Sequence, residues 1–134
     1  MTDSLTLIVL SDVFAICRLD ASASIPDWAD NFFSITRTRD ELSIVCPPRN
    51  VPAGIQCERD WRGLKVAGPL DFALTGILAA LAMPLAQAGI SIFAISTFDT
   101  DYVLVKDTQL ERAVAVLSQA GCQVRLEIPP QNEL

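Results

Sequence analysis

One pattern of strand and turn residues occurs twice in this chain, and it constrains the fold more than any other feature. The stretches FFSITRTRDELSIVC (residues 32–46) and IFAISTFDTDYVLVK (residues 92–106) align when one is shifted by 60 residues. Each has an apolar strand, a polar break with acidic residues and a second apolar strand, which is the pattern of a β-hairpin. Two such hairpins predict two related half-chain units, residues 1–60 and residues 61–134.

The second half of the chain has the clearer order of elements. WRGLKVAG (residues 61–68) alternates like a strand, residues 74–88 have helical spacing, and the hairpin follows. A second helix is predicted to begin at Asp107 as N-cap and to end at Gly121, before the strand CQVRLEI. The order βαββαβ predicts an α+β, ferredoxin-like unit with an antiparallel four-stranded sheet and two helices on one face.

The first half is less regular. LTLIVL and VFAICRL have the composition of strands, ASIPDWADN leaves room for only a short helical turn, and a connection with several prolines follows the hairpin. We therefore predict a reduced version of the same fold in residues 1–60.

The composition excludes several classes of function. The chain has 134 residues, of which 51% are hydrophobic, so we expect it either to bury its sheet surface thoroughly or to hide part of its apolar surface in a homodimer. A net charge of -6 argues against binding to nucleic acid. With no histidine and no nucleophile beside a base, the chain is not expected to be an enzyme.

No metal or cofactor is expected either. The D-x-D of Asp99 and Asp101 has no third ligand close by in the sequence. The four cysteines have no C-x-x-C spacing, which is typical of small buried side chains or free thiols in a reducing compartment.

Residues 72–98 contain no charge and are long enough to cross a bilayer. Their period changes from helical to strand-like at Gly89, so they predict a buried helix and a buried strand, with no membrane association. The N-terminal stretch has no basic region and only a short apolar run, so we expect no signal peptide and a cytoplasmic location.

The polar break at residues 97–101 and the start of the preceding helix offer complementary groups for a free amino acid. A helix N-terminus binds carboxylates, Gly76 lets a ligand approach the backbone, and Asp101 offers a counter-charge to an ammonium. We also expect the loop before this helix to adjoin the start of the next strand. Plainer interpretations stay open: a solvated turn for the acids, a packing role for Gly76, a helix cap at Thr75 and a subunit contact at Phe98.

These stretches, with GPLDFALTGILAALAMPLAQAG before the second hairpin, resemble bacterial tandem ACT-domain proteins and, at greater distance, the animal cytosolic arginine sensors of the CASTOR type. ACT domains are ferredoxin-like regulatory modules that bind amino acids at interfaces between paired domains. The resemblance thus implies two ACT units and a non-catalytic, allosteric regulator whose ligand is an amino acid. The alternative is a structural, partner-binding dimerisation module with no ligand.

The resemblance also implies the site residues. The family's hairpin motif S-T-F-x-x-D matches Ser96, Thr97, Phe98 and Asp101, and in the relatives a partner ACT domain contributes the positions of Ser91 and Ile92. The implied ligand-binding residues are Asp71, Phe72, Leu74, Thr75, Gly76, Ile77, Ile90, Ser91, Ile92, Thr97, Phe98 and Asp101. The arginine sensors have a glutamate in place of Leu74, which implies a smaller or more apolar ligand here. A homodimer would match the sensors' four ACT units and carry two equivalent sites.

Overall fold

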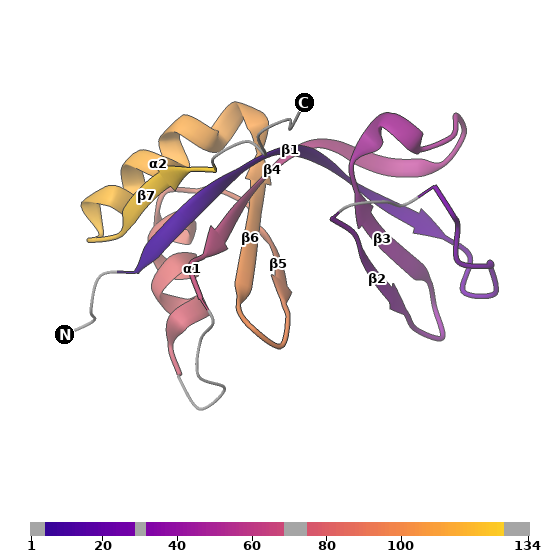
Figure 1. Ribbon diagram of the computed structural model, residues 1–134, viewed down its shortest axis with the longest axis horizontal. Coiled ribbons are helices and arrows are strands. Elements are labelled where there is room, and N and C mark those ends of the chain that lie inside the picture. The colour runs from indigo at the N-terminus through magenta and orange to yellow at the C-terminus, as the bar shows by residue number, and fades with distance from the viewer. Residues whose placement is uncertain (1–4, 29–31, 69–74, 128–134) are drawn as a thin grey trace, which may run out of the picture. The chain divides into compact units, whose positions relative to one another are not determined.

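The computed structural model describes residues 5–28, 32–68 and 75–127 (Figure 1). Its contacts separate two compact units, one of residues 1–11 with 62–134 and the other of residues 12–61. Two long strands, β1 (Thr6–Leu19) and β4 (Gln56–Val66), contribute to both units. The assignment of residues 1–60 and 61–134 to two ACT units stays a prediction.

The unit of residues 1–11 and 62–134 has the predicted order of strands and helices. After β4 come α1 (Ile77–Gln87), β5 (Phe93–Ser96), β6 (Asp101–Lys106), the short 3-10 helix η2 (Asp107–Gln109), α2 (Leu110–Gln119) and β7 (Gln123–Leu126). Hydrogen-bonded neighbours run in the order β7, β1, β4, β6, β5. The first half of β1 therefore lies between β4 and β7, so the described part of this sheet has five strands where we predicted four. β7 pairs with β1 in parallel.

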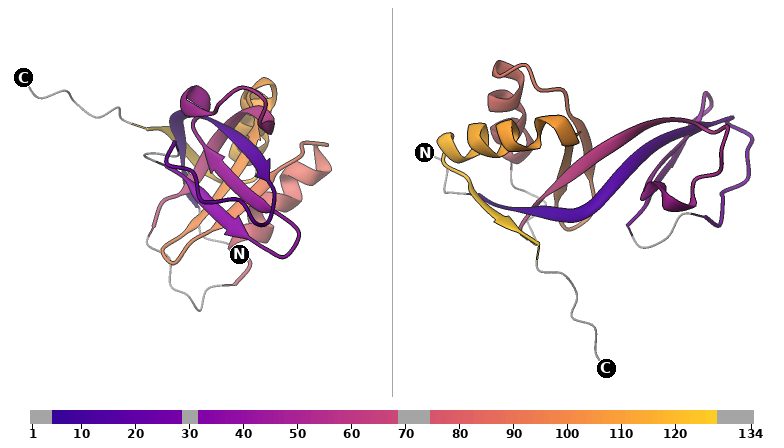
Figure 2. Two further views of the ribbon diagram at one scale, coloured as in Figure 1. Left: turned by 90° about the vertical axis from the view of Figure 1, so that its right-hand side faces the viewer. Right: turned by 90° about the horizontal axis from the view of Figure 1, so that it is seen from above.

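Both helices cover one face of this sheet, as predicted (Figure 2). Side chains alternate between the two faces of a strand, so every second residue shares a face. The buried cluster contains such alternate pairs from three strands together with residues of both helices: Leu7, Val9, Leu64, Val66, Val103, Val105, Leu81, Leu85, Ala113 and Leu117. Burial of this apolar surface holds the helices on the sheet.

The helix starts differ from the predicted ones in detail. The residue before α1 is Gly76, and the predicted start at Leu74 lies outside the described residues. Pro84 lies inside α1, as predicted. α2 begins at Leu110, and no side chain caps it, so the prediction of Asp107 as N-cap is wrong. Residues 107–109 form η2 instead, and Asp107 makes an ion pair with Arg62.

The unit of residues 12–61 contains the first hairpin, formed by β2 (Ser34–Arg37) and β3 (Leu42–Cys46). β3 also pairs antiparallel with the second half of β1. The two strands predicted before this hairpin form the single strand β1. After η1 (Pro48–Asn50) the chain enters β4. The predicted helical turn is absent from residues 20–28, and residues 29–31 lie outside the described ranges.

Buried cysteines help to fill the unit of residues 12–61, as the sequence predicted. Cys17 and Cys46 belong to its buried cluster with Ala15, Leu42 and Ile44. A hydrogen bond with the Cys46 thiol, together with burial, raises the pKa of Cys17. The Cys17 thiol therefore stays protonated and unreactive at neutral pH.

The two hairpin turns are built alike. Thr38 N–H donates to the Glu41 carbonyl, and Thr97 N–H donates to the Thr100 carbonyl, both at 2.9 Å. The side-chain oxygen of each threonine accepts from the N–H of the same partner, at 3.1 and 3.3 Å. The equivalent residues of the two hairpins are 59 positions apart, whereas the sequence alignment used a shift of 60. The alignment matched apolar residues, but the turns set the strand register.

Within the described ranges, no helix combines the length and the apolar character needed to cross a membrane.

Candidate functional site

The acidic turn of the second hairpin is fixed beside the end of β4. Thr100, which lies between the two acids, is 5% exposed, and its Oγ1 donates to the Val66 carbonyl at 2.7 Å. Val66 is the last residue of β4, so this buried bond joins the turn to the point where β4 ends. Sequence reasoning missed Thr100, whose signal in the sequence was a β-branched hydroxyl residue between two acids.

Asp101 is held in place, whereas Asp99 is not. Ser96 Oγ donates to Asp101 Oδ1 at 2.6 Å, and the two residues lie opposite each other in the β5–β6 pairing. Asp101 is half-buried and Asp99 is exposed. The interpretation of a solvated turn therefore suits Asp99, while Asp101 presents a carboxylate in a defined orientation.

Thr97 and Phe98 have different environments in the same turn. Thr97 Oγ1 donates to the Thr100 carbonyl at 3.0 Å, which closes the turn. Phe98 is 80% exposed. A large exposed aromatic side chain is available to a ligand or to another protein surface, so both interpretations of Phe98 stay open.

Gly76 has a backbone conformation that suits glycine. Its φ is +78°, in the left-handed region, and a Cβ built on it would meet no atom of the described residues within 4 Å. Its role is therefore conformational, and the packing interpretation is wrong. Gly76 also occupies the N-cap position of α1, which rules out Thr75 as the cap, and no side-chain hydrogen bond caps this helix end in the described residues. Among the described residues no side chain occupies the N–H groups of the first turn of α1, which are groups that bind anions.

The hairpin turn and the start of α1 lie at the same end of their unit (Figure 1). Residues 90–92 lie at the other end of α1, whose 11 residues extend about 16 Å. Within one unit the start of β5 is therefore distant from the start of α1, contrary to the expectation, because α1 runs back along the sheet before β5 begins. Residues 69–74 of the loop before α1 lie outside the described residues. The turn that follows β5 lies at the same end as the start of α1 (Figure 1).

The remaining predicted residues differ in their accessibility. Ile90 is 4% exposed and belongs to the buried cluster, and Ile92 packs against that cluster. Ser91 is exposed, so of these three residues it presents the most accessible side chain to another ACT domain. Thr75 is exposed and Ile77 is half-buried at the start of α1. The predicted residues Asp71, Phe72 and Leu74 lie outside the described residues.

Comparison with known families and structures bears on both halves of the chain. The family model of the ACT domain matches residues 56–119, and a second model, of an N-terminal domain, matches residues 12–54. The crystal structure of a protein from Agobacterium tumefaciens is 40% identical, covers 98% of this chain and 100% of its own, and has a TM-score of 0.89. Aspartate kinase from Clostridium acetobutylicum is 12% identical over 83% of this chain and 33% of its own, with a TM-score of 0.62, which shows the fold alone.

Curated relatives match shorter stretches. The human cytosolic arginine sensor for mTORC1 subunit 1 is 42% identical over 60 residues, which cover 44% of this chain and 18% of the human protein. The mouse protein of the same name is 32% identical over 106 residues, which cover 73% of this chain and 30% of the mouse protein. The chain thus spans less than a third of the length of the curated relatives it matches.

Proposed function

The chain belongs to the ACT-domain family, and on this premise we propose that it is a non-catalytic regulatory protein that binds a free amino acid at an interface between ACT domains. The observation that carries the proposal is the oriented carboxylate of Asp101, held by Ser96 at 2.6 Å, at the same end of the unit as the uncapped start of α1. These two features supply the two charges that a zwitterion needs.

The chemistry divides between the two features. The ammonium of the ligand pairs with Asp101, because a hydrogen bond between two ionised groups is stronger than one between neutral groups. The ligand carboxylate accepts from the N–H groups of the first turn of α1, where Gly76 leaves open space. The exposed Phe98 and a second ACT domain, which contributes Ser91, enclose the side chain.

We place this site in a cytoplasmic homodimer, in which two chains of two ACT units give four units and two equivalent sites. The name of the arginine sensors, which are cytosolic, supports this location. The apolar Leu74 favours a smaller or more apolar ligand than arginine. A ligand that binds across two domains shifts the equilibrium of the dimer or of a regulated partner, typically by about 1–3 kcal/mol.

Calorimetry of the full chain with the twenty amino acids tests the proposal. Asp101→Asn keeps the shape of the side chain and removes its charge, so we expect the affinity for the bound amino acid to fall about tenfold or more. Asp99→Asn removes the neighbouring, exposed acid and is the matched control, with an affinity close to that of the wild type. Equal losses in the two variants would contradict the assignment of Asp101.

The ligand-free dimerisation module remains the second candidate, and the 80% exposure of Phe98 is the observation that favours it. Sedimentation and thermal shift separate the two functions. A dimer that depends on Phe98, together with no heat and no thermal shift from any amino acid, would support the second candidate over the first.

A further inference from the structure

A pocket of about 560 Å³ lies in the same unit, beside the first turns of α2. One of its lining residues, Arg62, pairs with Asp107, the residue that directly follows β6. The acidic turn precedes β6, so the pocket lies at the opposite end of the sheet from Asp101. The volume is in the range of small-molecule sites.

The wall of the pocket is aliphatic. It is formed by Val9 of β1, Leu110 and Val114 of α2, and Val124 and Leu126 of β7. Ala113 and Leu117 of α2 are buried against the sheet, whereas Leu110 and Val114 pack against the same cluster and are only partly buried. Leu126 is 78% exposed, and a ligand in the pocket would remove part of this apolar surface from water.

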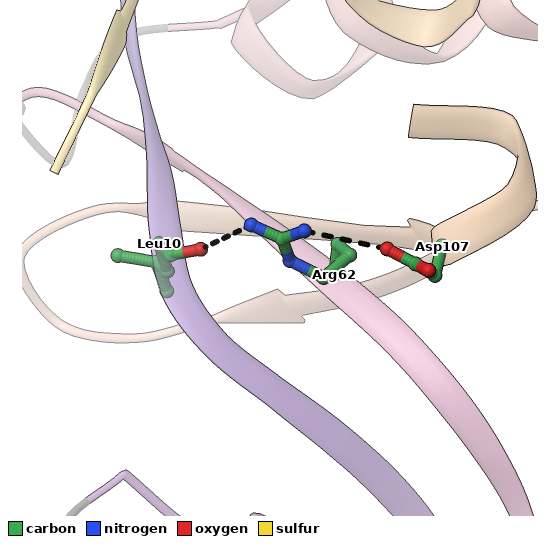
Figure 3. Close-up of polar contacts among 3 residues, drawn as sticks. All are labelled: Leu10, Arg62 and Asp107. Atoms are coloured by element: carbon green, nitrogen blue, oxygen red, sulfur yellow. Dashed lines mark hydrogen bonds and ion pairs between the residues drawn. The ribbon is translucent and has the colours of Figure 1, made fainter. Parts of the chain in front are cut away.

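Arg62 lines the pocket, and its guanidinium is held between Leu10 and Asp107 (Figure 3). Its Nη1 lies 3.3 Å from Asp107 Oδ1, and its Nη2 donates to the Leu10 carbonyl at 3.2 Å. Its Nε is buried and has no hydrogen-bond partner among the described residues. The guanidinium is thus fixed by its two partners, and its positive charge favours an anionic group of a ligand in the pocket.

Two further charges of opposite sign line the pocket. Glu111 of α2 and Arg125 of β7 are both exposed. Within the described part of the chain, neither side chain has a hydrogen-bond or ion-pair partner. Both are therefore available to a ligand.

We propose that this pocket is a second amino-acid site, contained in one ACT unit, for a free α-amino acid with an aliphatic side chain. The carboxylate lies toward Arg62 and Arg125, the ammonium pairs with Glu111, and the side chain packs on the aliphatic wall. This assignment uses none of the residues of the interface site and does not depend on the proposed function.

Other ligand classes fit the charges less well. An uncharged apolar ligand would cover the charges of Glu111 and Arg125 without giving either a partner, at the energetic cost of unpaired polar groups. The carboxylate of a fatty acid would be attracted by Arg62 and Arg125 but repelled by the like charge of Glu111. A zwitterion offers a carboxylate to the arginines and an ammonium to Glu111.

Calorimetry of the full chain with leucine, using two analogues, tests the recognition of both charges. N-acetyl-leucine lacks the ammonium and leucinamide lacks the carboxylate, so we expect each to bind about tenfold or more weakly than leucine. Equal affinity for leucine and N-acetyl-leucine would overturn the assignment and indicate a site for apolar carboxylates.

Variants separate this site from the one at Asp101. Glu111→Gln and Arg125→Gln should each weaken leucine binding about tenfold, whereas Arg112→Gln, an exposed change on α2 outside the pocket lining, should not. Leucine binding that is lost in Asp101→Asn but kept in Glu111→Gln would overturn the second site and leave the interface site standing. Methyl NMR signals of Val114 and Val124 should shift with leucine in Asp101→Asn, and unchanged signals would also overturn it.

Discussion

Ser96 Oγ donates a 2.6 Å hydrogen bond to Asp101 Oδ1, between residues that face each other across the β5–β6 pairing. The hydroxyl keeps the carboxylate in one orientation before a ligand arrives. A binding group that is held in place by a supporting residue loses less entropy on binding than a free one. The pair should therefore act as a unit in ligand binding.

A double-mutant cycle tests this coupling. Ser96→Ala should weaken amino-acid binding a few-fold, and Asp101→Asn should weaken it about tenfold or more. The double variant should bind no worse than Asp101→Asn alone, because the serine acts through the carboxylate. Calorimetry of the four proteins measures the cycle, with Ser118→Ala on α2 as the neutral control. Losses that add in the double variant would show that Ser96 acts independently.

Thr100→Val should destabilise the unit that contains the turn. The change is nearly isosteric, but it leaves the buried Val66 carbonyl without the 2.7 Å bond from Thr100 Oγ1. An unpaired buried acceptor costs about 1–3 kcal/mol. Urea denaturation measures the loss in the free energy of unfolding. Thr100→Ser retains the hydroxyl and should lose clearly less, and equal losses would mean that the methyl group, and not the bond, stabilises the turn.

Gly76→Ala should destabilise the start of α1 by about 1–2 kcal/mol, the cost of the left-handed region for an L-residue. A Cβ at this position meets nothing within 4 Å in the described part of the chain, so the cost is conformational. Gly76→Asn should cost less, because asparagine tolerates this region better than alanine does. Thermal unfolding measures both variants, and an alanine variant as stable as the wild type would contradict the assigned conformation.

The local elements of this fold could be predicted from the sequence, because alternation and helical spacing are short-range patterns. Both hairpins and both helices are examples. The five-stranded sheet could not be predicted in this way, because Thr6 pairs with Gln123 near the other end of the chain. That pairing inserts β1 between β4 and β7, and no local pattern indicates it.

The candidate site shows the same limit at the scale of single residues. Asp99 and Asp101 have the same side chain in the same turn, and in the sequence only the resemblance to the motif S-T-F-x-x-D separates them. The register, which sets Ser96 opposite Asp101, makes the difference. Likewise, the burial of Thr100 depends on the end of β4, which is 34 residues away along the chain.

Glu127 joins the end of the β7 segment to β1. Its Oε1 accepts from Ser11 N–H at 2.8 Å and from Ser11 Oγ at 2.7 Å. The hydrogen bond from the Ser11 backbone, the hydrogen bond from its hydroxyl and, to a lesser degree, the positive charge of Lys65 hold the pKa of Glu127 below its ordinary value, against the opposing effect of burial. All three stabilise the ionised carboxylate.

The lowered pKa of Glu127 predicts how stability depends on pH. A carboxyl group whose pKa is lower in the folded state adds stability above its unfolded pKa, about 4.3 for glutamate, and this contribution is lost as the pH falls through the folded value. We therefore expect Glu127→Gln to lower the melting temperature at pH 7 and to make its fall below pH ~4.3 shallower than in the wild type. Melting curves from pH 3 to 7 measure this, with Glu111→Gln as the control, since Glu111 has no partner in the described part of the chain. Only a difference in proton binding between the folded and unfolded states makes the melting temperature depend on pH. If Glu127→Gln leaves this dependence unchanged, Ser11 either binds the carboxylate in the unfolded chain as well or does not bind it in solution.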